Sequence, residues 1–131
     1  MAKQRHTSEL AASAVFRGKA GEDRAAKYFT EHGYTIVERN WRIRGGEIDI
    51  IAQCGDTLVF VEVKTFPRGS LYTLEQVLGQ IKQQKLIKTA KCFLSTYRKY
   101  NSLYIRFDVC VLDMPGLPQV WHIENAFSEL T

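Results

Sequence analysis

Four consecutive apolar residues, Leu58 to Val61, are the segment that most constrains the fold of this chain. A strand that is apolar on both faces is typical of the centre of a sheet, where other elements cover it on two sides. A short turn at 54–56, with a central glycine, separates this segment from another extended one at 47–53. We therefore expect an antiparallel hairpin whose second strand, at 57–64, lies near the middle of a sheet.

Side-chain spacing and turn residues predict five further elements. They are a helix at 18–32, a strand at 34–43, a long helix at 73–97, and two strands at 104–113 and 119–124. The long helix is expected because apolar residues recur at helical intervals, at Leu74, Val77, Leu78, Ile81, Ala90, Phe93, Leu94 and Tyr97. The order αβββαββ indicates an α/β fold in which the long helix crosses over between the central strand and the next one.

Length and composition suit a single compact domain, with 131 residues of which 45% are hydrophobic. Residues 1–18 are expected to form an N-terminal arm without fixed structure, and 19–131 the domain. The three cysteines, at 54, 92 and 110, form no CxxC pair, so neither disulfides nor a zinc site is expected. No apolar run approaches the roughly 20 residues of a membrane-spanning helix, and no signal peptide is recognisable. These features favour a location in the cytoplasm.

Positive charge is concentrated in one part of the chain. The formal net charge is +4, but no Asp or Glu occurs between Gln76 and Phe107. This segment carries seven basic residues: Lys82, Lys85, Lys88, Lys91, Arg98, Lys99 and Arg106. A field of one sign attracts polyanions such as nucleic acids. A solvated helix face has a similar composition, so this segment by itself leaves both interpretations open.

The end of the predicted hairpin carries charges that folding alone does not require. Alternation along the strand places Phe60, Glu62 and Lys64 on one face. With the turn centred at 55–56, Asp49 falls opposite Glu62, and their Cβ atoms are expected about 5 Å apart. Two carboxylates that close repel each other unless a cation lies between them, and their oxygens suit Mg²⁺ or Mn²⁺. The alternative is a surface hairpin with charged ends, which the spacing leaves open.

Other ionisable residues are weaker candidates. Glu22 opens the first helix, where it either approaches the metal through a water or favours the helix N-terminus. Asp108 lies within an apolar strand and is expected to be structural. The histidines, His6, His32 and His122, show no partnering pattern, so no histidine metal site is expected.

Eight short segments form a recognisable set. They are Gly21-Glu22-Asp23, Gly33-Tyr34, Asn40-Trp41, Gly46 to Ala52, Phe60 to Thr65, Lys82 to Leu86, Arg106 to Val109, and Asn125 to Phe127. Together, over about residues 18–128, they resemble the YraN family of bacterial proteins. That family is similar to the PD-(D/E)xK nucleases and most of all to archaeal Holliday-junction resolvases. The resemblance implies a restriction-endonuclease-like fold, with a central mixed five-stranded sheet flanked by helices.

The resemblance also implies roles for individual residues. The metal ligands would be Asp49, Glu62 and the Val63 carbonyl, the catalytic lysine Lys64, and the acid from the helix Glu22. Two positions depart from the family pattern. Phe66 stands where an arginine usually follows Lys-Thr, and 76–81 lacks the usual proline before Lys82. Both departures concern substrate contacts and leave the metal-binding set intact.

These observations predict a Mg²⁺- or Mn²⁺-dependent endonuclease that acts on DNA, with branched or structured DNA as the expected substrate. Four basic residues are expected to bind the DNA backbone: Lys82, Lys85, Lys88 and Arg44. The alternative is a nucleic-acid-binding module that keeps the nuclease fold without useful turnover and serves a partner protein.

The resemblance to junction resolvases also implies a homodimer, because resolving a four-way junction takes two symmetric cuts. The apolar C-terminal residues Val120-Trp121 and Ala126-Phe127 either offer a surface for such a dimer or cap the core.

Overall fold

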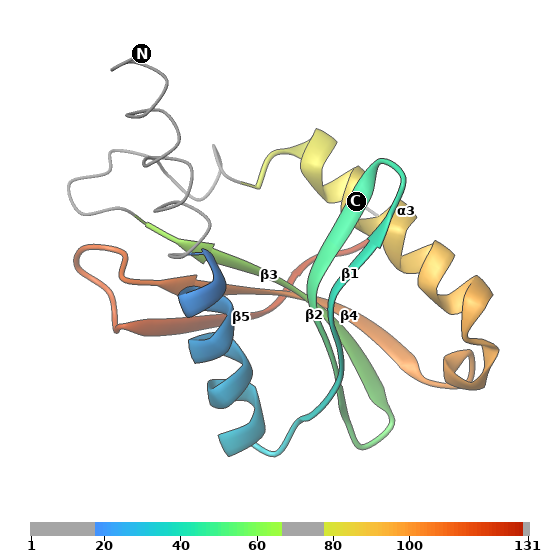
Figure 1. The fold of residues 1–131 in the computed structure, drawn as a ribbon, viewed down its shortest axis with the longest axis horizontal. Coiled ribbons are helices and arrows are strands. Elements are labelled where there is room, and N and C mark those ends of the chain that lie inside the picture. The colour runs from blue at the N-terminus through green and yellow to red at the C-terminus, as the bar shows by residue number, and fades with distance from the viewer. Residues whose placement is uncertain (1–17, 67–77, 130–131) are drawn as a thin grey trace, which may run out of the picture.

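The computed structural model describes residues 18–66 and 78–129, and Figure 1 shows their fold. A first helix, described over 18–31, precedes five strands, a second helix and a short 3-10 helix. Their bounds are β1 Thr35–Ile43, β2 Gly46–Cys54, β3 Thr57–Thr65, α3 Gln80–Thr96, η1 Arg98–Tyr100, β4 Tyr104–Leu112 and β5 Val120–Phe127. The α/β class and the element order predicted from the sequence are confirmed.

The strands form one mixed sheet in the order β1-β2-β3-β4-β5. The central strand β3 runs parallel to β4, whereas the other neighbouring strands are antiparallel. Parallel neighbours need a crossover connection, and α3 lies in the connection between β3 and β4. The five-stranded mixed sheet and the restriction-endonuclease-like architecture that the resemblance implied are thereby confirmed.

The two helices cover opposite faces of the sheet (Figure 1), and each packs on its own apolar cluster. Phe29 of the first helix belongs to the same cluster as Val59 and Val61. Phe93 of α3 belongs to the same cluster as Phe60, and we call this cluster the α3-side cluster. Because β3 is covered on both faces, its residues are apolar without alternation, and this explains the run that dominates the sequence.

The strands β2 and β3 pair over only part of their length. Their ladder runs from Cys54 opposite Thr57 to Ile50 opposite Val61 and ends there. Beyond this point β2 continues to Gly46 with β1 as its only partner strand among the described residues. The β1–β2 hairpin therefore bends away from β3, and the sheet opens into a fork (Figure 1). The predicted turn and register are confirmed up to the fork.

The helix α3 begins later than the sequence predicted. Gly79 is its N-cap, with extended backbone at φ −65° and ψ 167°, and Leu78 also lies outside the helix. A glycine costs about 1 kcal/mol in a helix interior, so the helix begins after it. The predicted helical residues 73–77 lie outside the described residues. Ile81, expected on the apolar face, is 73% exposed because buried contacts of α3 start only at Leu86.

The C-terminal apolar residues cap the core. The strand β5 extends to Phe127, beyond the predicted end, and Phe127 is buried while Trp121 packs against the α3-side cluster. Val120, Trp121 and Ala126 are half-buried, and the homodimer stays a prediction. The N-terminal arm was predicted at residues 1–18. All of it except residue 18 lies outside the described residues. Within the described ranges, neither helix has the length and apolarity needed to cross a bilayer.

Candidate metal centre and nucleic-acid interface

Asp49 lies at the fork between β2 and β3. Continuing the hairpin register one step beyond Ile50 and Val61 sets Asp49 opposite Glu62, as predicted. The backbones are no longer paired there, and the Val63 N–H donates to Asp49 Oδ2 at 2.8 Å. On an antiparallel edge the N–H and C=O of one residue face the same neighbouring strand, so the Val63 carbonyl also faces the fork.

Two further carboxylates approach Asp49. One carboxylate oxygen each from Glu22, Glu47 and Asp49 lie within 4.8 Å of one another, and we call these residues the acidic trio. Glu22 comes from the first helix, whereas Glu47 comes from β2. Sequence reasoning did not assign Glu47 to the site, although its shared face with Asp49, two residues later, was a usable signal.

Two close backbone approaches position the trio. At Gly21 a Cβ would overlap Thr65 Oγ1, so glycine lets the first helix settle on the end of β3 and carry Glu22 toward the fork. At Gly46 a Cβ would overlap Thr89 Oγ1, so glycine lets the β1–β2 hairpin lie against α3. The motif glycines next to Glu22 and Glu47 are therefore needed for packing.

Ionisation of Asp49 is disfavoured by its surroundings. Burial is the largest cause, the charge of Glu62 follows, and Glu22 and Glu47 add smaller contributions of the same sign. The Val63 hydrogen bond opposes them but is outweighed, and the pKa of Asp49 is raised from 3.8 to about 8. The carboxyl group therefore holds a proton at neutral pH, and binding a cation would release it.

Glu62 has a cationic partner, in contrast to Asp49. Lys82 Nζ lies 2.7 Å from Glu62 Oε1, and the two side chains are 41% and 11% exposed. The sequence predicted a cation between Glu62 and Asp49. The structure sets these two residues opposite each other, and the charge of Glu62 is paired with Lys82 of α3.

Lys64 follows Glu62 by two residues in β3 and therefore shares its face of the strand. Its side chain is partly buried, and its ammonium group forms no ion pair within 18–66 and 78–129. The neighbouring Phe66, which departs from the family pattern, is buried in the α3-side cluster. The Phe66 side chain therefore fills part of the core and does not point into the site.

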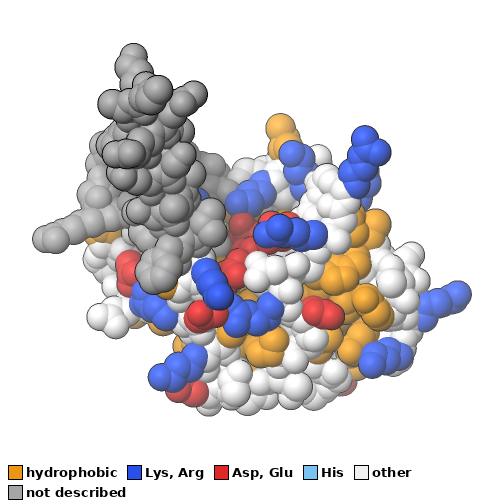
Figure 2. All heavy atoms as spheres, viewed as in Figure 1, with side chains coloured by type: hydrophobic (Ala, Val, Ile, Leu, Met, Phe, Trp, Pro, Cys, Tyr) orange, Lys and Arg blue, Asp and Glu red, His pale blue; other side chains and the backbone are white. Residues whose placement is uncertain are grey.

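A cleft of about 250 Å³ lies between the β1–β2 hairpin and α3, and we call it the α3 cleft. Its lining includes Glu47, Asp49 and Glu62 together with Lys82 and Lys85. Carboxylates that can hold a cation and lysines that can hold a phosphate thus border the same space. Figure 2 shows acidic side chains gathered between the first helix and the hairpin, with basic side chains around them.

Of the four basic residues predicted to bind DNA, two line the α3 cleft and two lie outside its lining. Lys82 and Lys85 line the α3 cleft. Lys88 is exposed one turn further along α3, and Arg44 is exposed at the tip of the hairpin, beside Gly45 of the cleft lining. We call Lys82, Lys85 and Lys88 the α3 lysines.

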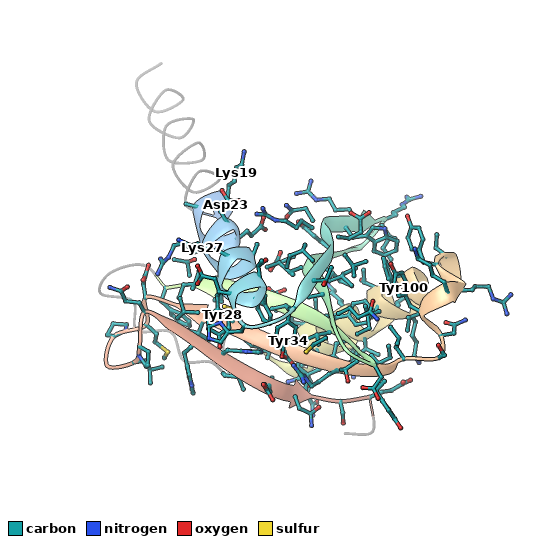
Figure 3. All side chains as sticks on the ribbon, turned by 90° about the horizontal axis from the view of Figure 1, so that it is seen from below. Lys19, Asp23, Lys27, Tyr28, Tyr34 and Tyr100 are labelled. Carbon is teal, nitrogen blue, oxygen red and sulfur yellow. The ribbon has the colours of Figure 1, made fainter. Side chains whose placement is uncertain are left out.

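A second cleft, of about 780 Å³, lies between β1 and the first helix and shares Glu47 with the first. Its lining carries both signs of charge, from Gly18, Lys19, Glu22, Asp23, Arg39, Asn40, Arg42 and Glu47. Two ion pairs occur in it, Arg39 with Asp23 at 2.6 Å and Arg42 with Glu47 at 3.3 Å. Lys19 and Asp23 project from the first helix, as labelled in Figure 3.

Asn40 lies beside the candidate site, and sequence reasoning did not single it out. It has a left-handed backbone, with φ of 51°, in the middle of β1. The β1–β2 register, with Arg39 opposite Ile50 and Trp41 opposite Ile48, sets Asn40 opposite Asp49. Asparagine tolerates positive φ better than most residues, and such strain often marks a functional position. Its occurrence in the motif Asn40-Trp41 was the only signal in the sequence.

The second aspartate of the sheet, Asp108, is buried and fully paired. It accepts from Arg106 Nε at 2.8 Å, Arg106 Nη2 at 2.9 Å and the Asn125 N–H at 3.0 Å, and His122 Nε2 lies 2.6 Å away. Burial would raise the pKa of Asp108, but the hydrogen bonds from His122, Arg106 and Asn125 outweigh it and lower the pKa. The expectation that Asp108 is structural agrees with this network.

His122, which showed no partnering pattern in the sequence, has partners in the fold. Besides Asp108, it contacts the Tyr28 hydroxyl through Nδ1 at 3.4 Å. The Tyr34 hydroxyl accepts from Arg106 at 2.7 Å. Tyr28 belongs to the first helix and Tyr34 follows the end of this helix, as labelled in Figure 3. These contacts join residues far apart in the sequence, and histidine spacing could not reveal them.

A family model described as uncharacterised protein family UPF0102 matches residues 21–112, which include the acidic trio, Glu62, Lys64 and the α3 lysines. The chain belongs to this family. It is similar to UPF0102 proteins of Treponema denticola (46% identical over 123 residues, 86% of this chain and 95% of the relative) and Geobacter metallireducens (43% over 111 residues, 84% and 90%). A UPF0102 protein of Syntrophus aciditrophicus is 47% identical over 112 residues, 84% of this chain and 87% of the relative.

Membership of UPF0102 confirms the resemblance to the YraN family. The family description assigns no activity, so the function has to be argued from the site.

Proposed function

We propose that this UPF0102 protein is a Mg²⁺- or Mn²⁺-dependent endonuclease that hydrolyses phosphodiester bonds of DNA. One observation carries the proposal: a partly buried Asp49 is surrounded by three other carboxylates, and two of these, Glu47 and Glu62, line with it a cleft that lysines also line. Like charges concentrated in this way destabilise a fold unless a cation binds among them. Lysines beside such a centre match a substrate whose negatively charged backbone has to approach a metal.

The donor set at the fork fits a hard divalent cation. Mg²⁺ and Mn²⁺ take carboxylate and carbonyl oxygens, and the fork offers both kinds. We assign Asp49, Glu62 and the Val63 carbonyl as ligands, with Glu22 as the acid that completes the site. Glu47, in the trio, stands close enough to contribute. When bound, the metal polarises the scissile phosphate and lowers the pKa of a water.

The protein's own groups have separate tasks in this proposal. Asp49 loses its proton on loading and then serves as a ligand. Lys64 orients the attacking water and screens the negative charge that grows on the phosphate. The α3 lysines and Arg44 hold backbone phosphates, and since every sequence presents the same phosphates, little sequence preference is expected.

The finer proposal concerns the substrate and the assembly. The resemblance to junction resolvases favours branched DNA, cut twice by a two-fold dimer with two sites at a fixed spacing. Light scattering of the free protein and sedimentation of its complex with a four-way junction test this. A monomer in both measurements would favour flaps or single strands as the substrate.

The deciding experiment is incubation with a panel of end-labelled DNAs, namely duplex, single strand, flap and four-way junction, in EDTA, Mg²⁺ or Mn²⁺. We expect cleavage only with a divalent cation, and its loss in Lys64→Ala and Glu62→Gln. Tight binding of the panel without cleavage in any metal would favour the alternative of a binding module. Equal cleavage by wild type and both variants would trace the activity to a contaminant.

A further inference from the structure

The Lys82–Glu62 ion pair places a proposed phosphate-binding lysine on a proposed metal ligand. The pair is short, at 2.7 Å, and spans the α3 cleft, which both residues line. Glu62 is nearly buried, whereas Lys82 is close to half exposed in the first turn of α3. Lys85 lines the same cleft but forms no ion pair with any described residue.

Lys82 cannot pair with the Glu62 carboxylate and bind a DNA phosphate at full strength at the same time. While its single charge is neutralised by a carboxylate 2.7 Å away, it contributes little to the attraction of a DNA backbone. A divalent cation on Glu62 would bring two positive charges beside the ammonium group and weaken the ion pair. The lysine stem is flexible and the side chain is 41% exposed, so the ammonium can turn into the cleft.

We propose that Lys82 exchanges partners, holding Glu62 in the metal-free protein and a DNA backbone phosphate once a divalent cation has bound. The inference rests on the proposed function and adds a coupling between its two ligands. Metal raises DNA affinity by freeing Lys82, and DNA raises metal affinity by the same factor, because linkage between binding sites is reciprocal. In the metal-free state the same lysine keeps Glu62 from standing unpaired opposite Asp49.

The first arm of the test measures metal binding alone. Mn²⁺ is titrated by calorimetry, at one pH, into wild type, Lys82→Gln and Lys85→Gln. Each variant removes one positive charge from the α3 cleft, so the general electrostatic gain in cation affinity is common to both. Only Lys82→Gln removes a competitor for Glu62. This variant should bind Mn²⁺ about fivefold tighter than Lys85→Gln, because a fivefold change in affinity corresponds to the free energy of one partly buried ion pair.

The second arm measures the coupling. Anisotropy of a labelled duplex is recorded in EDTA and in Mn²⁺, with Lys64→Ala in every protein to suppress cleavage and a gel to verify intact DNA. The ratio of the two DNA affinities should fall about fivefold when Lys82→Gln is added, by the same reciprocity. Lys85→Gln should weaken DNA binding in both conditions and leave the ratio unchanged. Lys82→Arg keeps a charge that can hold either partner, and it should retain the ratio.

The outcomes separate the exchange from the proposed function. Equal Mn²⁺ affinity in Lys82→Gln and Lys85→Gln, or an undiminished ratio in Lys82→Gln, overturns the exchange and leaves the nuclease proposal standing. A wild-type protein that binds no Mn²⁺ overturns the proposed function and the exchange with it. Circular dichroism on each variant verifies the fold, which substitution of the half-exposed Lys82 or the exposed Lys85 should not change.

Discussion

Replacing Asp49 with asparagine should stabilise the metal-free protein at neutral pH and abolish its response to divalent cations. Most substitutions of a buried, hydrogen-bonded residue destabilise a fold. Asp49 should be an exception, because its surroundings favour the neutral form of the side chain and raise its pKa to about 8. Asparagine is neutral at every pH, and its oxygen can accept the Val63 N–H in place of Asp49 Oδ2.

The sign and size follow from the raised pKa. Above the ordinary pKa of 3.8 the unfolded chain releases the Asp49 proton, whereas the folded protein keeps it up to about pH 8. The free energy of unfolding therefore falls as pH rises through this window, by at most about 1.4 kcal/mol for each pH unit. At pH 7.5 the upper limit is about 5 kcal/mol, and after solvent screening we expect Asp49→Asn to gain about 1–3 kcal/mol.

Thermal unfolding in EDTA at pH 7.5 and pH 5 measures this gain, which should appear as a rise in Tm of several degrees that shrinks at the lower pH. In saturating Mn²⁺ the wild type should gain stability and the variant should not. Asp108→Asn is the matched control, since it removes the charge of the paired aspartate and should destabilise. An Asp49→Asn protein less stable than wild type in EDTA at pH 7.5 would refute the reasoning and make Asp49 a structural residue.

Three further predictions follow from the same structure. Lys64→Ala should keep metal and DNA binding and lose about 10²-fold or more in cleavage rate, measured by single-turnover kinetics. Changing all three α3 lysines to glutamine should flatten the plot of log affinity against log salt by about 0.9 for each lost phosphate contact, whereas Lys91→Gln, whose lysine pairs with Glu129, should change it less. Gly46→Ala should destabilise by about 1–3 kcal/mol in urea unfolding, because its Cβ would overlap Thr89, and Thr89→Ala should recover part of the loss.

The hairpin and the central strand were predictable because their signals are local. A turn with a glycine fixes the register, and the register sets Asp49 opposite Glu62 without knowledge of the rest of the fold. The start of α3 was less predictable, since apolar spacing continues through Leu78 although Gly79 adopts an extended backbone. The fork itself has no sequence signal, because it depends on how the hairpin packs against α3 at Gly46.

Contacts between distant elements account for what the sequence did not reveal about the site. The pairing of Glu62 with Lys82 depends on α3 crossing over β3, which brings together residues 20 positions apart in the chain. Asn40 comes to the trio through the register of an edge strand, and its positive φ is a property of the folded backbone. The candidate residues could be recognised from residue types and spacings, whereas their contacts depend on the tertiary structure.

The two aspartates of the sheet, Asp108 and Asp49, stand in opposite electrostatic environments. Asp108 has a guanidinium, a backbone N–H and an imidazole around it, and its pKa is lowered. Asp49 has one backbone N–H and three carboxylates, and its pKa is raised to about 8. Both residues stand within apolar strand sequences, and in the sequence Asp49 differs chiefly by the hairpin register that sets it opposite Glu62. The surroundings of Asp49 are unfavourable for its charge in the absence of a cation, and this difference from Asp108 supports the proposed metal at the fork.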